Sequence, residues 1–364
     1  MSGQCSVSGA TKMVTKLFNI LVLFTFLSVA CFVVLSVYSK DSTLCVFQKP
    51  QRMANGNNTL SQWINKLAQL KTKAPNAGQE KTQMPPTTNE TLGPCPDTPP
   101  NLVGVIHVEF NFARTFDEVR KELTSLQEGG RYKPPDCIAQ QKVAIIIPFR
   151  NWHEHLKHWL YYLHPILIRQ QSDYRVYVIN QDGKGVFNKA KLMNAGFVEA
   201  LKEYDFDCFV FSDVDLVPMD DRNLYRCFDS PRHLSVAVDK FNFKLPYKTI
   251  FGGVNALSKE QFFKINGFSN TYWGWGGEDD DMYKRIYHHG MSISRPDMVT
   301  GKYRMIKHDR DLHNELNPKN LVKLKQTHWS MNEDGINSLK YTVKEIIKDK
   351  LFTYINVDIN APPS

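Results

Sequence analysis

Residues 143–150 read Val-Ala-Ile-Ile-Ile-Pro-Phe-Arg, an apolar run followed by a proline, an aromatic residue and a cation. A strand that is buried on both faces has such a run, because neither of its faces needs polar side chains. We therefore expect a buried strand over residues 143–147 that ends at Pro148.

The chain after this run alternates between two periodicities. Residues 153–170 and 189–203 have the apolar spacing of helices, whereas residues 174–180 and 208–217 have the composition of strands. Strands that alternate with helices predict an α/β domain with a mostly parallel central sheet and right-handed crossovers. Since such sheets bind ligands at the carboxyl ends of their strands, functional residues are expected directly after these runs.

The composition excludes some classes of protein. The apolar fraction of 42% and the charged fraction of 23% are those of a globular protein. The net charge is +8, but lysines and arginines are scattered among acids instead of forming basic runs. Nucleic-acid binding is therefore not favoured.

The N-terminal part contains an uncharged apolar segment over residues 17–38. Its length suits a helix that crosses a bilayer, so we interpret it as a membrane anchor. The alternative is a cleaved signal peptide, whose apolar region spans about 7 to 15 residues before a small-residue cleavage site. Here apolar residues 32–35 continue past the small residues 28–30, which favours the anchor.

The segment that follows the anchor has the composition of a linker. It is rich in Lys, Gln, Asn, Thr and Pro up to about Gly93. Two glycosylation sequons, at Asn57 and Asn89, indicate that this side of the membrane is lumenal, although the flanking lysines do not decide the orientation. We predict a cytoplasmic tail (residues 1–16), a transmembrane signal anchor (17–38), a lumenal stem (39–94) and a folded domain (95–364).

Four of the seven cysteines fall in the folded domain, namely Cys95, Cys137, Cys208 and Cys227. An even number in an oxidising lumen predicts two disulfides, and three pairings are possible. The alternative is four buried free thiols, and the spacing does not resemble a zinc site. Cys45, just beyond the anchor, is a candidate for an intermolecular bridge.

Two groups of residues have the chemistry of a metal site. Asp213 and Asp215 end the third predicted strand, where side chains two residues apart point the same way and suit Mg²⁺ or Mn²⁺ with a diphosphate. Met305 and His308 form the second group, and they reach one ion if their segment is helical or turned. A loop cap for the aspartates and simple packing for Met305 are the alternatives. Because a thioether is a soft ligand, Mn²⁺ is favoured over Mg²⁺.

Residues 273–281 read Trp-Gly-Trp-Gly-Gly-Glu-Asp-Asp-Asp. The acids begin a segment with helical spacing, so capping of the positive helix end accounts for one or two of them. A carboxylate at this junction is also placed to accept a proton from a sugar hydroxyl. The two tryptophans offer flat apolar faces, and the glycines permit the loop to move.

These motifs resemble those of the β-1,4-galactosyltransferases. The matching stretches are Phe-Asn-Lys-Ala-Lys-Leu (187–192), Phe-Ser-Asp-Val-Asp-Leu (211–216), Phe-Gly-Gly-Val (251–254), Asn-Gly-Phe (266–268) and the stretch 273–281. The resemblance covers residue 95 to the C-terminus and extends to the tail, anchor, stem and catalytic domain of Golgi type II enzymes. It implies a GT-A fold, a UDP-sugar donor, Mn²⁺ as cofactor, and a glycoprotein or glycolipid acceptor that ends in N-acetylglucosamine (GlcNAc).

The resemblance also implies roles for individual residues. Asp279 is the implied general base, and Gly277, Glu278, Asp279 and Asp280 are the implied acceptor-binding residues. Asp215, Met305 and His308 are the implied metal ligands, and Cys95 with Cys137 and Cys208 with Cys227 are the implied disulfides. The implied donor-binding residues are Pro148, Phe149, Arg150, Asn151, Phe187, Asn188, Lys189, Val214, Asp215, Ile250, Trp275, His308, Asp309 and Arg310.

The sequence departs from the family pattern at four places. Trp152 replaces the second arginine of Pro-Phe-Arg-Asn-Arg, and Lys189 replaces the arginine of Phe-Asn-Arg. The Arg-Phe pair that is usual in the family is absent from residues 317–321. Ile250 stands where galactose-specific members carry tyrosine, and an aliphatic residue there resembles members that accept UDP-N-acetylgalactosamine (UDP-GalNAc).

The leading hypothesis is an inverting β-1,4-galactosyltransferase that acts on the 4-hydroxyl of terminal GlcNAc, with GalNAc or mixed donor use as the alternative. A homodimer or a modifier subunit is compatible with the sequence. A catalytically silent, membrane-tethered sugar-binding protein would have lost Asp215, His308 or Asp279, and all three are present. A metal-dependent phosphohydrolase leaves the tryptophan loop unexplained.

Overall fold

The computed structural model describes residues 92–112, 114–308 and 313–363. The predicted anchor (17–38), almost all of the predicted stem, and both sequon asparagines, Asn57 and Asn89, lie outside these residues. Within the described ranges, no helix is both long enough and apolar enough to cross a bilayer.

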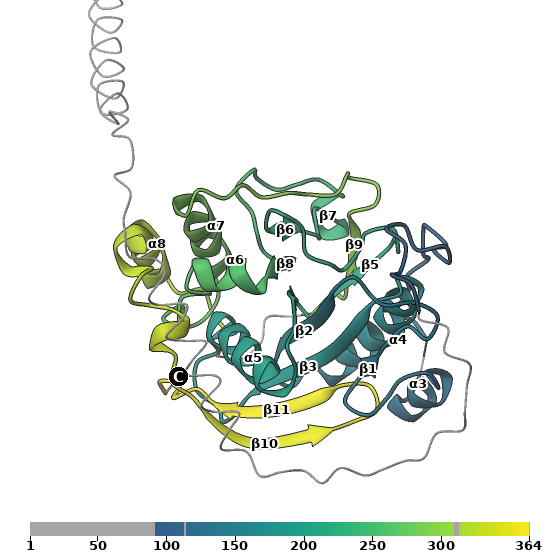
Figure 1. Cartoon of the computed structure of the whole chain (residues 1–364). Coiled ribbons are helices and arrows are strands. Elements are labelled where there is room, and N and C mark those ends of the chain that lie inside the picture. Colours follow the sequence, from purple (N-terminus) through teal and green to yellow (C-terminus); the bar gives the residue numbers. More distant parts are fainter. Residues whose placement is uncertain (1–91, 113, 309–312, 364) are drawn as a thin grey trace, which may run out of the picture. The chain divides into compact units, whose positions relative to one another are not determined.

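The described domain is built on one large sheet, with the strand order β10-β11-β3-β2-β4-β8-β6 and with β1 paired to β3 (Figure 1). Its strands are β1 (Arg131–Tyr132), β2 (Lys142–Phe149), β3 (Asp173–Gln181), β4 (Cys208–Ser212), β6 (Arg232–His233), β8 (Val254–Ser258), β10 (Thr342–Lys348) and β11 (Thr353–Asp358).

The centre of this sheet is parallel and its edges are antiparallel. β11, β3, β2 and β4 pair in parallel, whereas β8 runs antiparallel to β4 and β10 runs antiparallel to β11. The predicted α/β class is thus confirmed, and the predicted parallel pairing is found among these four central strands. β1 and β6 also pair antiparallel, with β3 and β8 respectively, so the whole sheet is mixed.

The first predicted strand is longer than expected. β2 continues through Pro148, which is paired with Ile179, to Phe149, which is paired with Asn180. Pairing with β4 stops at Ile146, so beyond that residue β2 has a neighbour on one side only. Proline has no N–H to donate to a neighbouring strand. Because β2 has no neighbour on one side at this point, Pro148 need not break a hydrogen bond between strands, and the strand continues through it.

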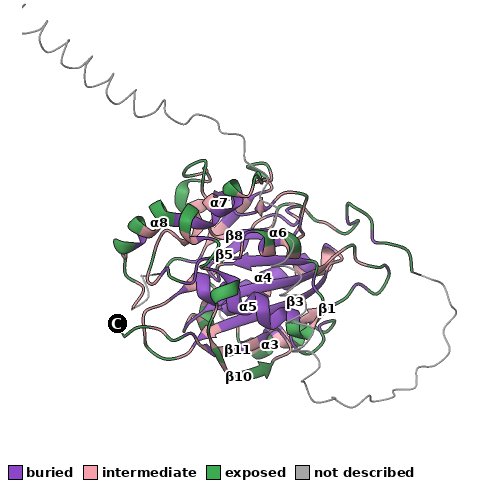
Figure 2. Ribbon diagram, turned by 60° about the vertical axis from the view of Figure 1, so that its left-hand side comes forward, coloured by how far each residue is buried: buried purple, intermediate pink, exposed green. Residues whose placement is uncertain are grey.

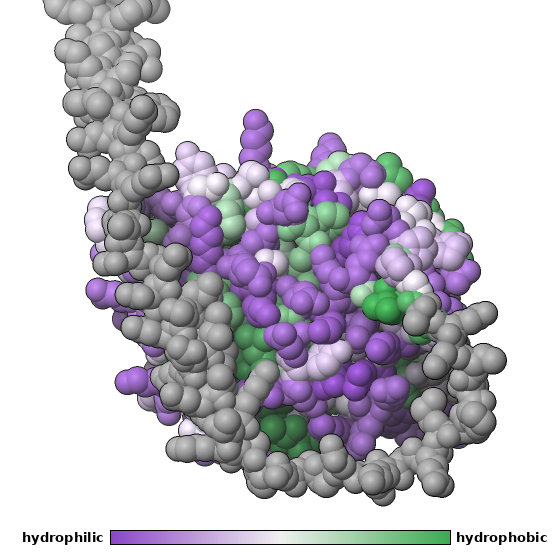
Figure 3. All heavy atoms as spheres, viewed as in Figure 1, coloured by the Kyte–Doolittle hydropathy of each residue, from purple (hydrophilic) through white to green (hydrophobic). Residues whose placement is uncertain are grey.

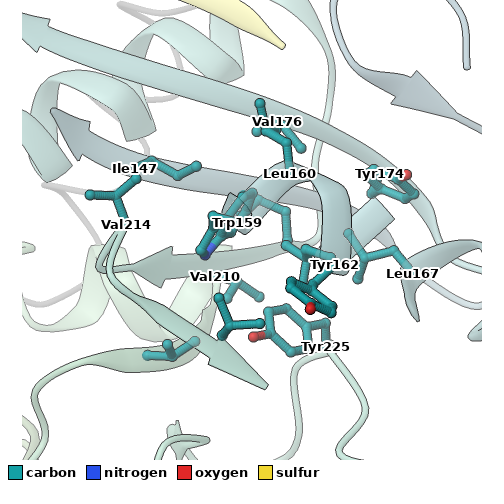
Figure 4. Packing of buried hydrophobic residues seen from close by; sticks show 14 of the residues in the cluster. Ile147, Trp159, Leu160, Tyr162, Leu167, Tyr174, Val176, Val210, Val214 and Tyr225 are labelled. Atoms are coloured by element: carbon teal, nitrogen blue, oxygen red, sulfur yellow. The ribbon is translucent and has the colours of Figure 1, made fainter. Parts of the chain in front are cut away.

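Two helices cover opposite faces of the sheet. Ile145 and Ile147 of β2 pack in one cluster with α4 (His153–Arg169), whereas the intervening Ile146 packs in a second cluster with α5 (Lys189–Glu203). The alternation follows from the two-residue period of a strand. Figure 2 shows that the central strands, α4 and α5 are mostly buried, whereas α8 and the edge strand β10 carry many exposed residues, and Figure 4 shows the packing on the α4 side.

The remaining helices and a second sheet complete the domain. The helices are α3 (Phe116–Glu122), α6 (Lys259–Lys264), α7 (Glu278–His288) and α8 (Lys319–Ser330), with short 3-10 helices η1 (Asp239–Phe241) and η2 (Ile336–Ser338). The second sheet has the order β5-β9-β7, formed by β5 (Leu216–Pro218), β9 (Lys302–Met305) and β7 (Ala237–Val238). On the face in Figure 3, hydrophilic side chains predominate and hydrophobic ones lie in small groups.

Both disulfides have the pairing that the family resemblance implies. Cys95 is bonded to Cys137, and Cys208 is bonded to Cys227. The second bridge joins the first residue of β4 to the segment before β6, so it encloses the loop that carries Asp213 and Asp215. The alternative of four free thiols is wrong.

Candidate active site

The third predicted strand is in fact two strands, and the aspartates lie between them. β4 ends at Ser212, β5 begins at Leu216, and the residues between them form a turn from one sheet to the other. Val214 is buried in the α4-side cluster that also contains Ile147 (Figure 4). The prediction that both carboxylates project from one strand in the same direction is wrong, because the chain changes sheets at this point.

Asp215 faces the second predicted metal-binding segment. His308 Nε2 lies 3.0 Å from Asp215 Oδ2, and the Ile306 amide donates to the Asp215 carbonyl oxygen over 2.8 Å. Met305 is the last residue of β9 and pairs with Leu216, the neighbour of Asp215. The segment is therefore a strand end followed by an irregular stretch, not a helix, and it still brings Met305 and His308 beside Asp215.

The chemistry of these donors fits a divalent cation of intermediate softness. They are a carboxylate, an imidazole and a thioether, a set that suits Mn²⁺ better than Mg²⁺. Across the described ranges, no three His, Cys, Asp or Glu side chains gather into a metal site. The observed convergence of Asp215 and His308 supports this candidate.

Asp213 has a different partner. Its carboxylate lies 2.8 Å from Lys189 Nζ, and the same ammonium is 3.5 Å from Glu278 Oε1. Lys189 is the first residue of α5, so it joins the aspartate turn to the start of α7. Burial raises the pKa of Asp213 and the Lys189 ammonium opposes that rise. Burial works against the charge on Lys189, but the carboxylates of Asp213, Glu278 and Asp279 together raise its pKa.

The acid block begins α7, as the sequence predicts. Gly277 precedes the helix with φ of +93°, a conformation that residues with a Cβ rarely adopt. Glu278 is the first helical residue, and its side chain is only 14% exposed. Burial raises its pKa to about 7, with Lys189 opposing and Asp279 adding to the rise. Glu278 thus has an acid–base equilibrium near neutral pH.

The last acid of the block is structural. Asp281 is 1% exposed. Its carboxylate accepts from Arg285 Nε at 2.6 Å, from the Thr327 hydroxyl at 2.7 Å and from the Tyr272 hydroxyl at 3.2 Å. Arg285 is fully buried. These contacts fix α7 against α8 and the tryptophan loop.

Asp279 fits against the Phe-Gly-Gly-Val segment. A Cβ added to Gly252 would lie 2.3 Å from Asp279 Oδ2, so the glycine leaves the room that this carboxylate occupies. Asp279 Oδ1 accepts from the Asp280 amide at 3.0 Å. Burial also raises the pKa of Asp280, which Asp279 reinforces and a hydrogen bond from Tyr247 opposes. In the sequence, Gly252 was recognised only as part of the Phe-Gly-Gly-Val motif, and its fit against Asp279 was not predicted.

Ile250 lies two residues before Gly252. Its amide donates to the Tyr247 carbonyl oxygen over 3.3 Å, and its own carbonyl oxygen accepts from Arg295 Nη2 at 2.9 Å. Phe251, between Ile250 and Gly252, is fully buried. The backbone around Ile250 is therefore held on the side of the site that contains Asp279.

The two tryptophans of the loop differ. Trp273 packs against the α5-side cluster, and its carbonyl oxygen accepts from Asn317 Nδ2 at 2.8 Å. Trp275 is 52% exposed, and its backbone pairs with Leu316. The Gly274 amide between them donates to the Phe187 carbonyl oxygen over 2.8 Å. Only Trp275 therefore offers a broad accessible face.

The residues predicted to bind the nucleotide lie where β2 and β3 end. Pro148 and Phe149 belong to β2 and are buried. Arg150 is 5% exposed, donates to the Gly185 carbonyl oxygen over 2.8 Å and lies 4.8 Å from the Phe187 ring centroid. Asn151 is exposed, with φ of +62°. The sheet thus places these residues at one carboxyl-terminal edge.

Asn188 has contacts that are structural in character. It is fully buried, its side-chain oxygen caps α5 by accepting from the Lys191 amide at 2.8 Å, and its Nδ2 donates to the Asn270 carbonyl oxygen over 2.8 Å. The donor-binding role of Asn188 stays a prediction. Asp309 and Arg310, also predicted to bind the donor, lie outside the described residues.

Two aromatic neighbours of His308 were not recognised from the sequence. The Trp152 ring centroid is 4.4 Å from that of His308 and 4.5 Å from that of His155. Burial lowers the pKa of His155 to about 4, with the His308 charge adding to the effect and Asp215 opposing it. The three-residue spacing of Trp152 and His155 at the start of α4 was the available signal.

Two family models match the sequence. The N-terminal region of glycosyl transferase group 7 matches residues 95–228, and the N-terminal domain of galactosyltransferase matches residues 232–309. Together they span all the predicted acceptor- and metal-binding residues, and all the predicted donor-binding residues except Arg310.

Curated relatives and a solved structure agree with these matches. β-1,4-Galactosyltransferase 1 of Mus musculus is 58% identical over 279 residues, which are 76% of this chain and 70% of the relative. β-1,4-Galactosyltransferase 2 of Cricetulus griseus is 58% identical over 281 residues, which are 77% and 76% of the two chains. A mutant Drosophila β-1,4-galactosyltransferase 7, solved with manganese, UDP-Gal and xylobiose, matches with a TM-score of 0.51 and 27% identity, over 61% of this chain and 95% of that one. The domain therefore has the fold of a GT-A glycosyltransferase, and the chain belongs to the β-1,4-galactosyltransferase family.

Proposed function

We propose that this chain is an inverting β-1,4-galactosyltransferase that moves galactose from UDP-galactose to the 4-hydroxyl of terminal GlcNAc. The observation that carries the proposal is the charged network at the sheet edge. Lys189 links Asp213 in the turn after β4 to Glu278 at the start of α7, next to Asp279. One compact site thus holds a candidate metal-binding face and a candidate acceptor-binding face.

The metal-binding face would consist of Asp215, Met305 and His308. When bound there, Mn²⁺ would neutralise the negative charge that develops on the UDP leaving group. The 3.0 Å approach of His308 Nε2 to Asp215 Oδ2 supports this assignment. The mutant Drosophila relative solved with manganese and UDP-Gal supports the choice of metal and donor.

The acceptor-binding face would consist of Gly277, Glu278, Asp279 and Asp280. Asp279 takes the proton from the acceptor 4-hydroxyl, and that oxygen forms a bond to the anomeric carbon as the bond from this carbon to the UDP oxygen breaks. Attack from the face opposite UDP inverts the anomeric configuration. No covalent intermediate is needed, and the exposed Trp275 would cover the donor sugar.

The identity of the donor sugar depends on Ile250. Without a tyrosine at this position, the site lacks a phenol that fills space and that could donate a hydrogen bond. UDP-GalNAc, with its larger C2 substituent, is therefore the second candidate donor. Ile250→Tyr is expected to raise the preference for UDP-galactose over UDP-GalNAc.

A panel of donors and acceptors tests the proposal. The full chain is incubated with UDP-galactose or UDP-GalNAc, with or without Mn²⁺, and with GlcNAc-terminated or xylose-terminated acceptors, and NMR identifies the linkage of the product. We expect a β-1,4-linked product on GlcNAc that requires the metal. Release of free sugar or phosphate without transfer would favour a hydrolase, and binding without turnover would favour a silent sugar-binding protein.

We also propose that the enzyme is a single-pass type II protein of the Golgi membrane, with the domain from residue 95 onward in the lumen. The apolar segment 17–38 and the sequons at Asn57 and Asn89 motivate this topology. Glycoproteins and glycolipids are the candidate acceptors, and a homodimer or a modifier subunit is a candidate partner. In intact vesicles, the domain should be protected from added protease, and full digestion without detergent would refute the topology.

A further inference from the structure

Two aromatic rings surround His308 in addition to its carboxylate neighbour Asp215. Trp152 is the residue directly before α4, and His155 lies three residues later in the first turn of the helix. Both rings meet His308, which follows β9 about 150 residues later in the chain. The ring centroids of Trp152 and His308 are 4.4 Å apart at an interplanar angle of 57°. Those of His155 and His308 are 5.3 Å apart at 82°.

Trp152 and His155 also contact each other. The Trp152 and His155 centroids are 4.5 Å apart at 76°, so each of the three rings touches the other two. Tilted and edge-to-face contacts of this kind favour particular ring orientations. In addition, the side of His308 that carries Nε2 meets Asp215 Oδ2 at 3.0 Å. The imidazole is therefore held by two rings and a carboxylate.

His155 has unused capacity for a hydrogen bond. Its Nε2 is buried and has no hydrogen-bond partner among the described residues. Buried polar atoms usually have a partner, so an orphaned one beside a candidate site needs an explanation. The nitrogen lies in the same ring that contacts His308, which indicates a place where a ligand of the site could supply the missing partner.

We propose that Trp152 and His155 are positioning residues that hold the His308 imidazole with its Nε2 toward Asp215, so that the metal-binding face is preformed. This inference rests on the proposed function, because it concerns the metal-binding face assigned there. Trp152 stands where the family resemblance leads one to expect an arginine.

The alternative is that the two rings only fill space at the beginning of α4. A positioning role and a space-filling role predict different effects of matched leucine and phenylalanine substitutions on Mn²⁺ binding. Leucine at either position keeps apolar volume but removes the flat ring, whereas phenylalanine keeps the ring. At residue 155, phenylalanine also removes both nitrogens, which separates ring packing from the hydrogen bond of Nε2.

The test measures Mn²⁺ binding to the full chain in the presence of UDP, by titration calorimetry and by quenching of tryptophan fluorescence by the paramagnetic ion. Removing residues that orient metal ligands typically weakens metal binding by about 10- to 100-fold. We expect a loss of this size for Trp152→Leu and His155→Leu, and rescue to within about threefold by Trp152→Phe, since the ring is retained. Trp329→Phe, at a 75% exposed position of α8, is the control and should bind like the wild type.

Fluorescence gives a second readout, which reports whether the ion binds next to Trp152. Trp152→Phe should bind Mn²⁺ and lose part of the quenching, because the tryptophan next to His308 is gone, whereas Trp329→Phe should keep the same quenching per bound ion. Leucine variants that melt like the wild type and bind Mn²⁺ within threefold of it would overturn the inference. If they do not fold, undiminished quenching in Trp152→Phe overturns it instead. A wild type that binds no Mn²⁺ with UDP would refute the metal site of the proposed function itself, and this inference with it.

Discussion

Asp279 and Asp281 stand two residues apart in the first turn of α7, yet their surroundings are opposite. Asp281 is buried and accepts hydrogen bonds from Arg285, Thr327 and Tyr272. Asp279 is partly exposed, and one of its oxygens faces the space left by Gly252. The same residue type thus serves packing on one side of the helix and is available for chemistry on the other.

This difference explains why the first turn of α7 tolerates a block of like charges. The positive end of a helix stabilises acids in its first turn, and each acid here has its own partner. Lys189 lies near Glu278, and the Asp280 amide donates to Asp279. Tyr247 donates to the Asp280 carboxylate, and Arg285 binds Asp281. Four consecutive acids therefore do not form one cluster of unpaired charge, and the comparison can be tested residue by residue.

The largest expected effect is on stability, at Asp281. Asp281→Leu leaves the buried Arg285 guanidinium without its carboxylate, and breaking a buried pair in this way typically costs about 3 to 5 kcal/mol of unfolding free energy. The matched substitution Asp279→Leu should change this free energy by less than about 1 kcal/mol, because that side chain is partly exposed. Chemical denaturation of both variants measures the difference, and equal losses would erase the distinction between the two aspartates.

A smaller effect is expected at Gly252, on activity instead of stability. In Gly252→Ala the new Cβ would lie 2.3 Å from Asp279 Oδ2, so the carboxylate must move. Since a misplacement of about 1 Å can cost about a hundredfold in rate, transfer to GlcNAc should fall by up to that factor. Gly93→Ala is the control, because nothing lies within 4 Å of its added Cβ. Transfer rates of the two variants that differ by less than twofold would refute the proposed fit of Asp279 against Gly252.

The raised pKa of Glu278 predicts that the stability of the protein depends on pH. Its pKa is about 7 in the folded protein against 4.5 for an ordinary glutamate. Between these values the folded state binds more protons than the unfolded state, so this residue lowers the unfolding free energy as pH rises from about 4.5 to 7. Melting temperatures across this range should fall less steeply in Glu278→Gln than in the wild type. Glu345→Gln, at an exposed position, should follow the wild type. Parallel curves for Glu278→Gln and the wild type would show that the pKa is not raised.

The smallest effect is expected at Asp280. The backbone N–H of Asp280 donates a hydrogen bond to the Asp279 carboxylate, and this backbone donor is unchanged when residue 280 is asparagine. Asp280→Asn should therefore change transfer by less than about threefold, equivalent to about 0.7 kcal/mol in the barrier. Initial rates over a range of acceptor concentrations check this. A large rise in KM for the acceptor would show that acceptor binding needs the negative charge of Asp280 and not only the hydrogen bonds that an asparagine can also make.

Local patterns in the sequence predicted the fold better than they predicted the partners in the site. The run at 143–147 and the spacing of α5 depend on neighbours within one element. α5 has the expected bounds, and β2 contains the expected run but continues to Phe149. The division of residues 208–217 into two strands was missed, because apolar content does not show which sheet a strand joins. Arg285 lies four residues after Asp281, so their pairing had a local signal.

The missed parts of the site depend on contacts between distant segments. Nothing near Asp213 in the sequence indicates Lys189, which belongs to a different helix. The need for glycine at 252 arises only once α7 brings Asp279 beside it. The contact of Trp152 with His308 likewise requires α4 and the end of β9 to meet. Tertiary packing sets these relations, and periodicity within one element does not encode them.

The most direct test of the proposed chemistry is the turnover of Asp279→Asn with UDP-galactose, Mn²⁺ and a GlcNAc-terminated acceptor, measured alongside its binding of UDP and Mn²⁺. Loss of a general base typically costs about 10²- to 10⁴-fold in rate. We predict a loss in that range, with binding of UDP and Mn²⁺ and the unfolding free energy close to those of the wild type. Turnover near the wild-type rate would contradict the assignment of Asp279 as the base that deprotonates the acceptor.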